Sequence, residues 1–352
     1  MGAVLVGDGG MHVALPARNV KHSLGTGSRR EERTVNDVQT MSRRQLLAAG
    51  TAVAAAAGFG GLGPLAGSAF GAERLVPKQQ IGIQLFTVRT LAEADLPGTL
   101  ALLADIGYGE VEVAGLFGRT PAQFRALLDR YRLRAIAGHQ LVGPALIPFF
   151  GAREVEDALD EAQTLGQPYV GTAGITIPTG IVEGVGEPQT ANRYRQLADL
   201  ANEWGAAAKA RGMQLYLHVH YWEFGHDPRT GESLFQILLD DTDPQLVWFE
   251  PDLFWMVFGG IDPLDWIPRY EDRFPLFHVK DGNPNPAGGY FNPGFTDLGE
   301  GSIDFRPIFE ALKHKNAHHY IVERDDQPDP ARTARVGYEY LLNLRARKGG
   351  GY

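Results

Sequence analysis

The stretch from Gln214 to Phe224, QLYLHVHYWEF, starts as an apolar run typical of a strand and ends in two histidines and a glutamate. Side chains two residues apart share one face of a strand, so Tyr216, His218 and His220 are expected to point the same way. Neutral imidazole binds divalent metals and also relays protons. For an isolated pair of histidines, hydrogen bonding within a core is the simpler interpretation, and the rest of the chain has to decide.

Short apolar runs alternate with segments of helical periodicity on both sides of this stretch. The predicted strands cover residues 81–88, 110–114, 133–137, 168–173, 213–220, 246–250, 275–279 and 319–323. The predicted helices cover residues 96–106, a segment opened by Thr120 and Pro121, and residues 154–165, 192–211, 234–239, 262–269, 305–315 and 334–344. A long loop rich in Pro, Gly and Asn is expected over residues 282–299.

Eight strand-then-helix units in about 270 residues are the pattern of a (β/α)8 TIM barrel. An open doubly wound sheet is the alternative, but such a sheet usually has a Gly-rich phosphate turn after its first strand. The residues Val88, Arg89 and Thr90 do not form one. The sequence therefore predicts an α/β protein with a single TIM-barrel domain over residues 73–352.

Residues 41–72 differ in composition from this body. They contain the twin arginines Arg43 and Arg44, followed by a moderately apolar run of Ala, Gly and Leu and a small-residue exit. This pattern resembles a twin-arginine export signal, which predicts a periplasmic or secreted protein with no stable membrane insertion after processing. A transmembrane anchor is the alternative, disfavoured by the Gly and Ala content and by Pro64.

Residues 1–40 fit neither a signal nor a domain, because they are polar and irregular and lie upstream of the arginine pair. Export signals normally start close to that pair. We interpret these residues as a non-structural upstream extension, with the true start at Met41.

Composition narrows the possible functions. The chain has 352 residues, 44% of them hydrophobic, which is enough for one large core. The formal charge is −9; residues 1–72 hold seven Lys or Arg and four Asp or Glu, so the remainder carries 26 basic against 38 acidic residues, a balance of −12. Such a body disfavours non-specific binding to nucleic acid or anionic membranes. Because cysteine is absent, any metal must sit on nitrogen and oxygen ligands.

Ionisable and polar side chains recur at the predicted C-terminal ends of the strands, where TIM barrels carry their chemistry. They are Gln84, Glu112, His139, His218, His220, Glu250, Asp252, His278, Lys280, Glu323 and Asp325. Each one alone is explained by a helix cap or a surface charge, but their recurrence on consecutive strands is not. A mixed cluster of histidine and carboxylate without thiols suits Mn²⁺, Mg²⁺, Fe²⁺, Co²⁺ or Zn²⁺.

Seven motifs in order, IGIQLFTVR, IGYGEVEVAG, HVHYWEF, FEPDLFW, FHVKD, DLGEGSIDF and YIVERD, resemble the xylose-isomerase-like TIM barrel family. This family of sugar phosphate isomerases and epimerases also includes repair enzymes of the AP endonuclease 2 type. The resemblance implies one divalent metal, with Asp252, His278 and Glu323 as three of its ligands. The first ligand, usually a glutamate, falls on His218, with His220 or Glu223 as the other possibilities.

The resemblance implies a metal-dependent sugar isomerase or epimerase that removes a proton next to a carbonyl. Glu323 is then the metal-adjacent acid or base. Its possible catalytic partners are His139, His220 and Lys280. Substrate contacts are expected from Gln84, Glu112, Trp222, Glu223 and Trp255, the two tryptophans as apolar walls beside a sugar ring.

Because a histidine stands in place of the first glutamate, reactions other than isomerisation or epimerisation stay open. One base, a metal and an imidazole also suit a lyase or dehydratase acting on 3-keto-glycosides. Because an exported enzyme seldom meets sugar phosphates, a free or glycosidically linked sugar is the expected small-molecule substrate. A non-catalytic sugar-binding barrel is a further alternative, whereas the balance of −12 and the export signal argue against DNA repair.

Overall fold

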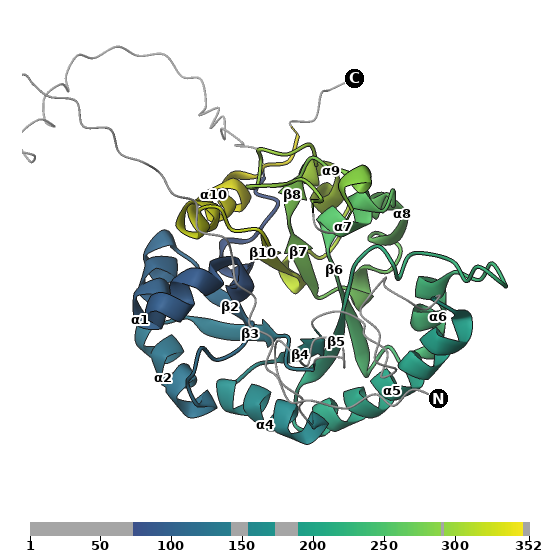
Figure 1. Cartoon of the computed structure of the whole chain (residues 1–352), viewed down its shortest axis with the longest axis horizontal. Coiled ribbons are helices and arrows are strands. Elements are labelled where there is room, and N and C mark those ends of the chain that lie inside the picture. Colours follow the sequence, from purple (N-terminus) through teal and green to yellow (C-terminus); the bar gives the residue numbers. More distant parts are fainter. Residues whose placement is uncertain (1–72, 142–153, 173–188, 290–291, 348–352) are drawn as a thin grey trace, which may run out of the picture. The chain divides into compact units, whose positions relative to one another are not determined.

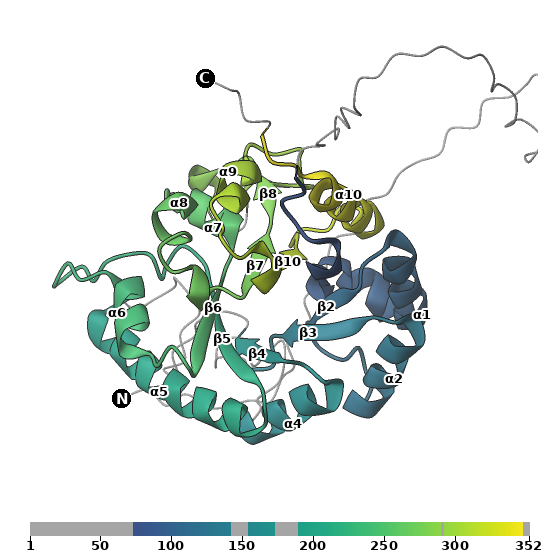
Figure 2. The ribbon, with the colours of Figure 1, turned by 180° about the vertical axis from the view of Figure 1, so that it is seen from behind.

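A computed structural model describes residues 73–141, 154–172, 189–289 and 292–347. In these residues, strands alternate with helices around a ring, with the strands inside and the helices outside (Figures 1 and 2). The predicted export signal and the upstream extension lie outside the described residues and stay predictions. Among the described helices, none combines the length and the apolar character needed to cross a bilayer.

The parallel strands of the described chain form a nearly closed barrel, which confirms the predicted (β/α)8 fold. They are β1 (Ile81–Gln84), β2 (Glu110–Val113), β3 (Arg134–Gly138), β4 (Tyr169–Thr172), β5 (Gln214–Val219), β6 (Val247–Pro251), β7 (Leu276–Val279) and β10 (His319–Val322). Five of them pair in the order β3-β2-β1-β10-β7, and three in the order β4-β5-β6. Parallel bridges between Leu141 and Thr172 and between Asp252 and His278 join the two sheets.

The surrounding helices are α1 (Arg89–Ile106), α2 (Pro121–Tyr131), α4 (Val155–Leu165), α5 (Ala191–Ala210), α6 (Leu234–Asp241), α7 (Leu253–Phe258), α8 (Pro263–Trp266), α9 (Phe305–Glu310) and α10 (Pro330–Asn343). The predicted start of α2 is confirmed, because Thr120 and Gln123 form a reciprocal capping box with Pro121 at the first turn. The outer faces of the strands and the inner faces of the helices share one apolar core.

Several predicted boundaries are wrong. The strand predicted over residues 81–88 ends at Gln84, whose side chain accepts a hydrogen bond from the backbone N–H of Phe86 and starts a 3-10 turn (Leu85–Val88). The following helix begins at Arg89 instead of residue 96, with a kink at Asp95. α7 was not predicted at all, because its apolar run LFWMVF has no polar face to mark a helical period. The helix predicted over residues 305–315 ends at Glu310.

The predicted loop over residues 282–299 has structure of its own in its described part. The short strands β8 (Asp281–Gly282) and β9 (Phe295–Thr296) pair antiparallel. The carboxylate of Asp281 accepts backbone N–H groups of Gly282, Gly299, Gly301 and Ile303. This buried carboxylate therefore holds the two ends of the segment together beside β7.

The barrel interior contains an apolar layer. Ile136, Tyr216, Leu276 and Ile321 form a buried layer inside the ring of strands. Gly171 on β4 faces this layer, and a Cβ atom placed there lies 2.3 Å from the Tyr216 ring. A glycine is therefore required at this position for the tyrosine to cross the barrel.

We expect Gly171→Ala to lower the free energy of unfolding by about 1–3 kcal/mol, since the added methyl overlaps a buried ring that has no room to move. Gly109→Ala is the matched control, because a Cβ there meets no atom within 4 Å. The free energy of unfolding of this control should change by less than about 1 kcal/mol. Thermal or urea unfolding of both variants checks the prediction, and equal stabilities would contradict it.

Candidate active site

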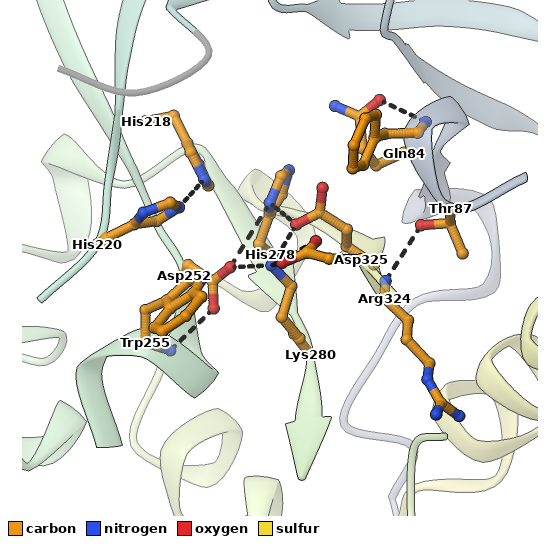
Figure 3. Close-up of polar contacts among 12 residues, drawn as sticks. Gln84, Thr87, His218, His220, Asp252, Trp255, His278, Lys280, Arg324 and Asp325 are labelled. Atoms are coloured by element: carbon orange, nitrogen blue, oxygen red, sulfur yellow. Dashed lines mark hydrogen bonds and ion pairs between the residues drawn. The ribbon is translucent and has the colours of Figure 1, made fainter. Parts of the chain in front are cut away.

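Side chains from three neighbouring strand ends meet around a single lysine. The ammonium Nζ of Lys280 lies 2.8 Å from Oδ2 of Asp252, 2.7 Å from Oε2 of Glu323 and 3.1 Å from Oδ1 of Asp325. Nδ1 of His278 lies 2.8 Å from the same Oε2 of Glu323. Figure 3 shows Asp252, His278, Lys280 and Asp325 turned toward one centre.

The local fold orients Asp252 toward this centre. The residue directly follows β6 and caps α7, because its Oδ1 accepts the backbone N–H of Trp255 at 3.0 Å. Its other oxygen, Oδ2, is left for the cluster. The sharp change from strand to helix therefore fixes the carboxylate in one orientation.

His218 on β5 and His220, directly after its end, point into the same region, as the alternation of strand side chains predicted. Nε2 of His218 lies 3.0 Å from Nε2 of His220, and Nδ1 of His218 lies 3.0 Å from Oε2 of Glu250. Glu223 binds backbone instead: its Oε2 accepts the N–H of His220 at 2.7 Å. Burial raises the pKa of Glu223 to about 7. Among the described residues, it stands outside the clusters of metal-ligating size.

A second level of charged groups lies deeper in the barrel. Glu112 accepts a hydrogen bond from the hydroxyl of Tyr216, and its two oxygens lie 3.0 Å from Nε2 of His139 and 2.6 Å from Nε2 of His278. Glu250 also contacts these imidazoles, with Oε2 at 3.3 Å from His278 and 3.4 Å from His139. Glu112 is thus surrounded by protein donors, beneath the place where it was predicted to touch substrate.

These contacts set the protonation of the deeper level. Burial works to raise the pKa of Glu112, but His139 and His278 together lower it well below its usual value. Burial and the charge of Glu112 raise the pKa of Glu250 to about 7. Burial works against a charge on His139, but Glu112 raises its pKa to about 9. In this deeper level, protons are therefore shared between the carboxylates of Glu112 and Glu250 and the imidazoles of His139 and His278.

Gln84 and the two tryptophans line the site in different ways. The amide Nε2 of Gln84 is buried and has no hydrogen-bond partner among the described residues. In Figure 3 this end of the amide points toward His278, as a donor to a substrate oxygen would. The rings of Trp222 and Trp255 stack at 6.3 Å and 28°. Trp255 is only 1% exposed and packs in the core, whereas Trp222 is partly exposed and is the better candidate for a substrate wall.

The donor atoms fit a divalent metal. Three groups have ligand atoms within 4.8 Å of one another: Asp252, His278 and Glu323; His218, His220 and Asp252; and His139, His218, Glu250 and His278. Nδ1 of His278 and Oδ2 of Asp252 are buried, and neither makes a well-aligned hydrogen bond. These buried nitrogen and oxygen donors suit a cation such as Mn²⁺, Mg²⁺, Fe²⁺, Co²⁺ or Zn²⁺.

The sequence did not assign roles to three residues that the structure brings into the network. Tyr216 lies two residues before His218 on the same strand face, and Glu250 lies two residues before Asp252. Asp325 lies two residues after Glu323 and contacts Lys280. The period of two along a strand was the available signal, but it does not tell which level a side chain reaches.

Comparison with known proteins identifies the family. A profile of the xylose isomerase-like TIM barrel family matches residues 100–344. The chain therefore belongs to this family, and the resemblance seen in its motifs is confirmed.

Individual relatives are distant. An inosose dehydratase of Clostridium perfringens is 32% identical over 166 residues, which are 44% of this chain and 53% of that protein. The chain thus matches about half the length of that relative. An inosose dehydratase of Geobacillus kaustophilus is 26% identical over 291 residues, which cover 71% of this chain and 90% of that protein.

Solved structures share the fold. A sugar phosphate isomerase/epimerase of Parabacteroides distasonis superposes with a TM-score of 0.62 at 22% identity, covering 75% of this chain and 98% of that one. The IolI protein with a bound zinc atom superposes with a TM-score of 0.57 at 16% identity, covering 75% of this chain and 97% of that one. The relatives named here include enzymes, the inosose dehydratases.

We expect the purified barrel to carry a stoichiometric divalent metal and Asp252→Asn to lose it, because the variant removes a charged ligand from the cluster. The affinity should fall by more than the roughly 10–100-fold that contacts outside the ligand sphere contribute. Asp199→Asn, on an exposed position of α5, is the control and should keep its metal. Elemental analysis and titration of the metal-free protein measure both. A wild-type protein without metal, or an Asp252→Asn variant that retains it, would contradict the prediction.

Proposed function

We propose that the protein is a divalent-metal-dependent lyase of the dehydratase type. Its substrate would be a cyclic ketone of the sugar class, either a keto-cyclitol or a 3-keto-glycoside, from which it removes the proton beside the carbonyl and expels a β-hydroxyl or β-alkoxyl group. The two inosose dehydratase relatives support the elimination, because an inosose is a keto-cyclitol.

The observation that carries this proposal is the unequal chemistry around the lysine. Glu323 and Asp252 supply carboxylates from β10 and β6, whereas β5 presents the imidazoles of His218 and His220 where the family usually has a second glutamate. Two carboxylates on opposite sides of the substrate suit proton exchange. A carboxylate on one side only leaves no second carboxylate to return the proton to carbon, which suits proton removal followed by elimination.

Asp252, His278, Glu323 and one histidine of β5 would hold the metal. When bound, it would polarise the carbonyl oxygen of the substrate and so make the neighbouring C–H bond more acidic.

Glu323 is the proposed base. Burial works to raise its pKa, but His278 and Lys280 lower it well below its usual value, so the group is a carboxylate at neutral pH. It takes the proton from carbon, the electrons of the C–H bond form a carbon–carbon double bond, and the β C–O bond breaks. Burial works against the charge on Lys280, but Asp252, Asp325 and Glu323 raise its pKa well above the usual value. Lys280 is therefore an ammonium that can transfer a proton to the departing oxygen, which takes the electrons of the broken C–O bond and leaves as water or an alcohol.

Epimerisation is the second candidate. His139, whose pKa is raised to about 9, lies on a different strand end from Glu323. A proton removed by one group and returned by the other from the opposite face of the carbon would invert its configuration. The resemblance of residues 41–72 to an export signal supports an unphosphorylated substrate for either reaction.

We expect the metal-loaded protein to convert a keto-cyclitol or a 3-keto-glucoside into an unsaturated ketone with loss of water or aglycone. Glu323→Gln should slow the reaction by about 10²–10⁴-fold, because it removes the base, whereas Asp199→Asn should not. Mass spectrometry of products formed in deuterated water separates the candidates. Deuterium incorporation without elimination would establish epimerisation, and no turnover by metal-loaded protein would favour a sugar-binding barrel.

A further inference from the structure

His278 contacts a carboxylate through each of its ring nitrogens. Nε2 lies 2.6 Å from Oε2 of Glu112, and Nδ1 lies 2.8 Å from Oε2 of Glu323. An imidazole that binds a metal is neutral and carries one N–H group. If the metal-bound ring keeps its N–H on Nε2, toward Glu112, the lone pair of Nδ1 faces the space between Asp252 and Glu323. The contact with Glu112 is the shorter of the two, which favours this tautomer.

His218 repeats the arrangement with its nitrogens exchanged. Nδ1 lies 3.0 Å from Oε2 of Glu250, and Nε2 lies 3.0 Å from Nε2 of His220. Nδ1 makes a close contact with Glu250 but no aligned hydrogen bond. If the metal-bound ring carries its N–H on Nδ1, toward Glu250, the lone pair of Nε2 faces the group that contains His220 and Asp252. Each imidazole therefore has one nitrogen against a deeper carboxylate and the other directed at the upper cluster.

Glu112 and Glu250 lie behind these two rings, and both also contact His139. Both are fully buried, one on β2 and the other on β6, below the level of Asp252 and Glu323. The hydroxyl of Tyr216 donates to Glu112 and fixes its orientation. A carboxylate behind a metal-binding histidine sets the tautomer and the ring orientation and makes the free nitrogen a stronger ligand.

We propose that Glu112 and Glu250 are positioning residues, a pair of buried carboxylates that turn His278 and His218 so that Nδ1 of one and Nε2 of the other face one divalent cation. The arrangement makes His218, not His220, the metal ligand of β5. This proposal rests on the proposed function, since both concern the same metal site. For Glu112, the positioning role replaces the direct contact with substrate that the sequence predicted.

The test compares metal dissociation constants of Glu112→Gln, Glu250→Gln and the wild type, measured by competition with a chelator. Each variant keeps the shape of the side chain but offers an amide in place of a carboxylate. We expect each to bind metal about 10–100-fold more weakly while keeping one binding site per chain. His218→Gln should lose more affinity than His220→Gln.

Glu110→Gln is the matched control. Glu110 lies on the same strand as Glu112, is equally buried and contacts His319 at 2.7 Å and Arg134, but it is two residues closer to the opposite end of the barrel. Its replacement is expected to lower the melting temperature without changing the metal dissociation constant. The control therefore distinguishes the general loss of stability on removing a buried carboxylate from the loss of metal affinity on removing a carboxylate that contacts a metal-binding histidine.

A spectroscopic readout is independent of stability and activity. Nitrogen-15 spectra of the histidine rings in the zinc-loaded protein should show His278 with its proton on Nε2 and His218 with its proton on Nδ1. In Glu112→Gln, the His278 signals should shift or broaden while those of His218 stay in place.

Three results would overturn the proposal. If the variants fold and bind metal as tightly as the wild type, the carboxylates do not position the ligands, while the proposed function stands. If the wild type binds two metals per chain and Glu250→Gln loses one, then His139, His218, Glu250 and His278 form a second metal site instead. If the wild type binds no metal, the positioning role and the proposed function both fail.

Discussion

The contact between His278 and Glu112 links the barrel to its proposed chemistry. The imidazole reaches from β7 to a carboxylate on β2 across the inside of the ring, with Nε2 and Oε2 2.6 Å apart. The backbone of the same residue pairs with Asp252 in one of the two bridges that join the sheets. The residue that brings β6 and β7 together at the strand ends is therefore also the residue that connects the deep and the upper levels of charge.

The cost of burying this charge explains the composition of the site. An ionised carboxylate in a barrel interior loses hydration worth several kcal/mol unless donors or cations replace the water. Tyr216, His139 and His278 supply donors to Glu112, and Lys280 supplies a charge to Asp252 and Glu323. A divalent cation at the upper level would take over this role for Asp252 and Glu323, whose oxygens lie with Nδ1 of His278 within ligand distance of one another, and this is the physical basis of the metal proposal.

Sequence periodicity was enough to predict the fold, because each unit repeats an apolar strand and an amphipathic helix. It also predicted that Asp252, His278, Lys280 and Glu323 would meet, since all lie at or just after strand ends that share one rim of the barrel. It failed where local hydrogen bonds decide the structure, as at Gln84, which ends β1 by accepting from Phe86. It also could not give depth: Glu112 and Gln84 pair in register on neighbouring strands, yet one is held by three side chains and the other keeps an amide N–H group free among the described residues.

The central claim is that one divalent metal binds between the ends of β5, β6, β7 and β10. A crystal structure of the metal-loaded protein with anomalous scattering data would test it most directly. The account predicts a single anomalous peak at about 2.0–2.2 Å from Nδ1 of His278, Nε2 of His218 and oxygens of Asp252 and Glu323. A peak among His139, Glu250 and Nε2 of His278, or no peak within the barrel, would contradict it.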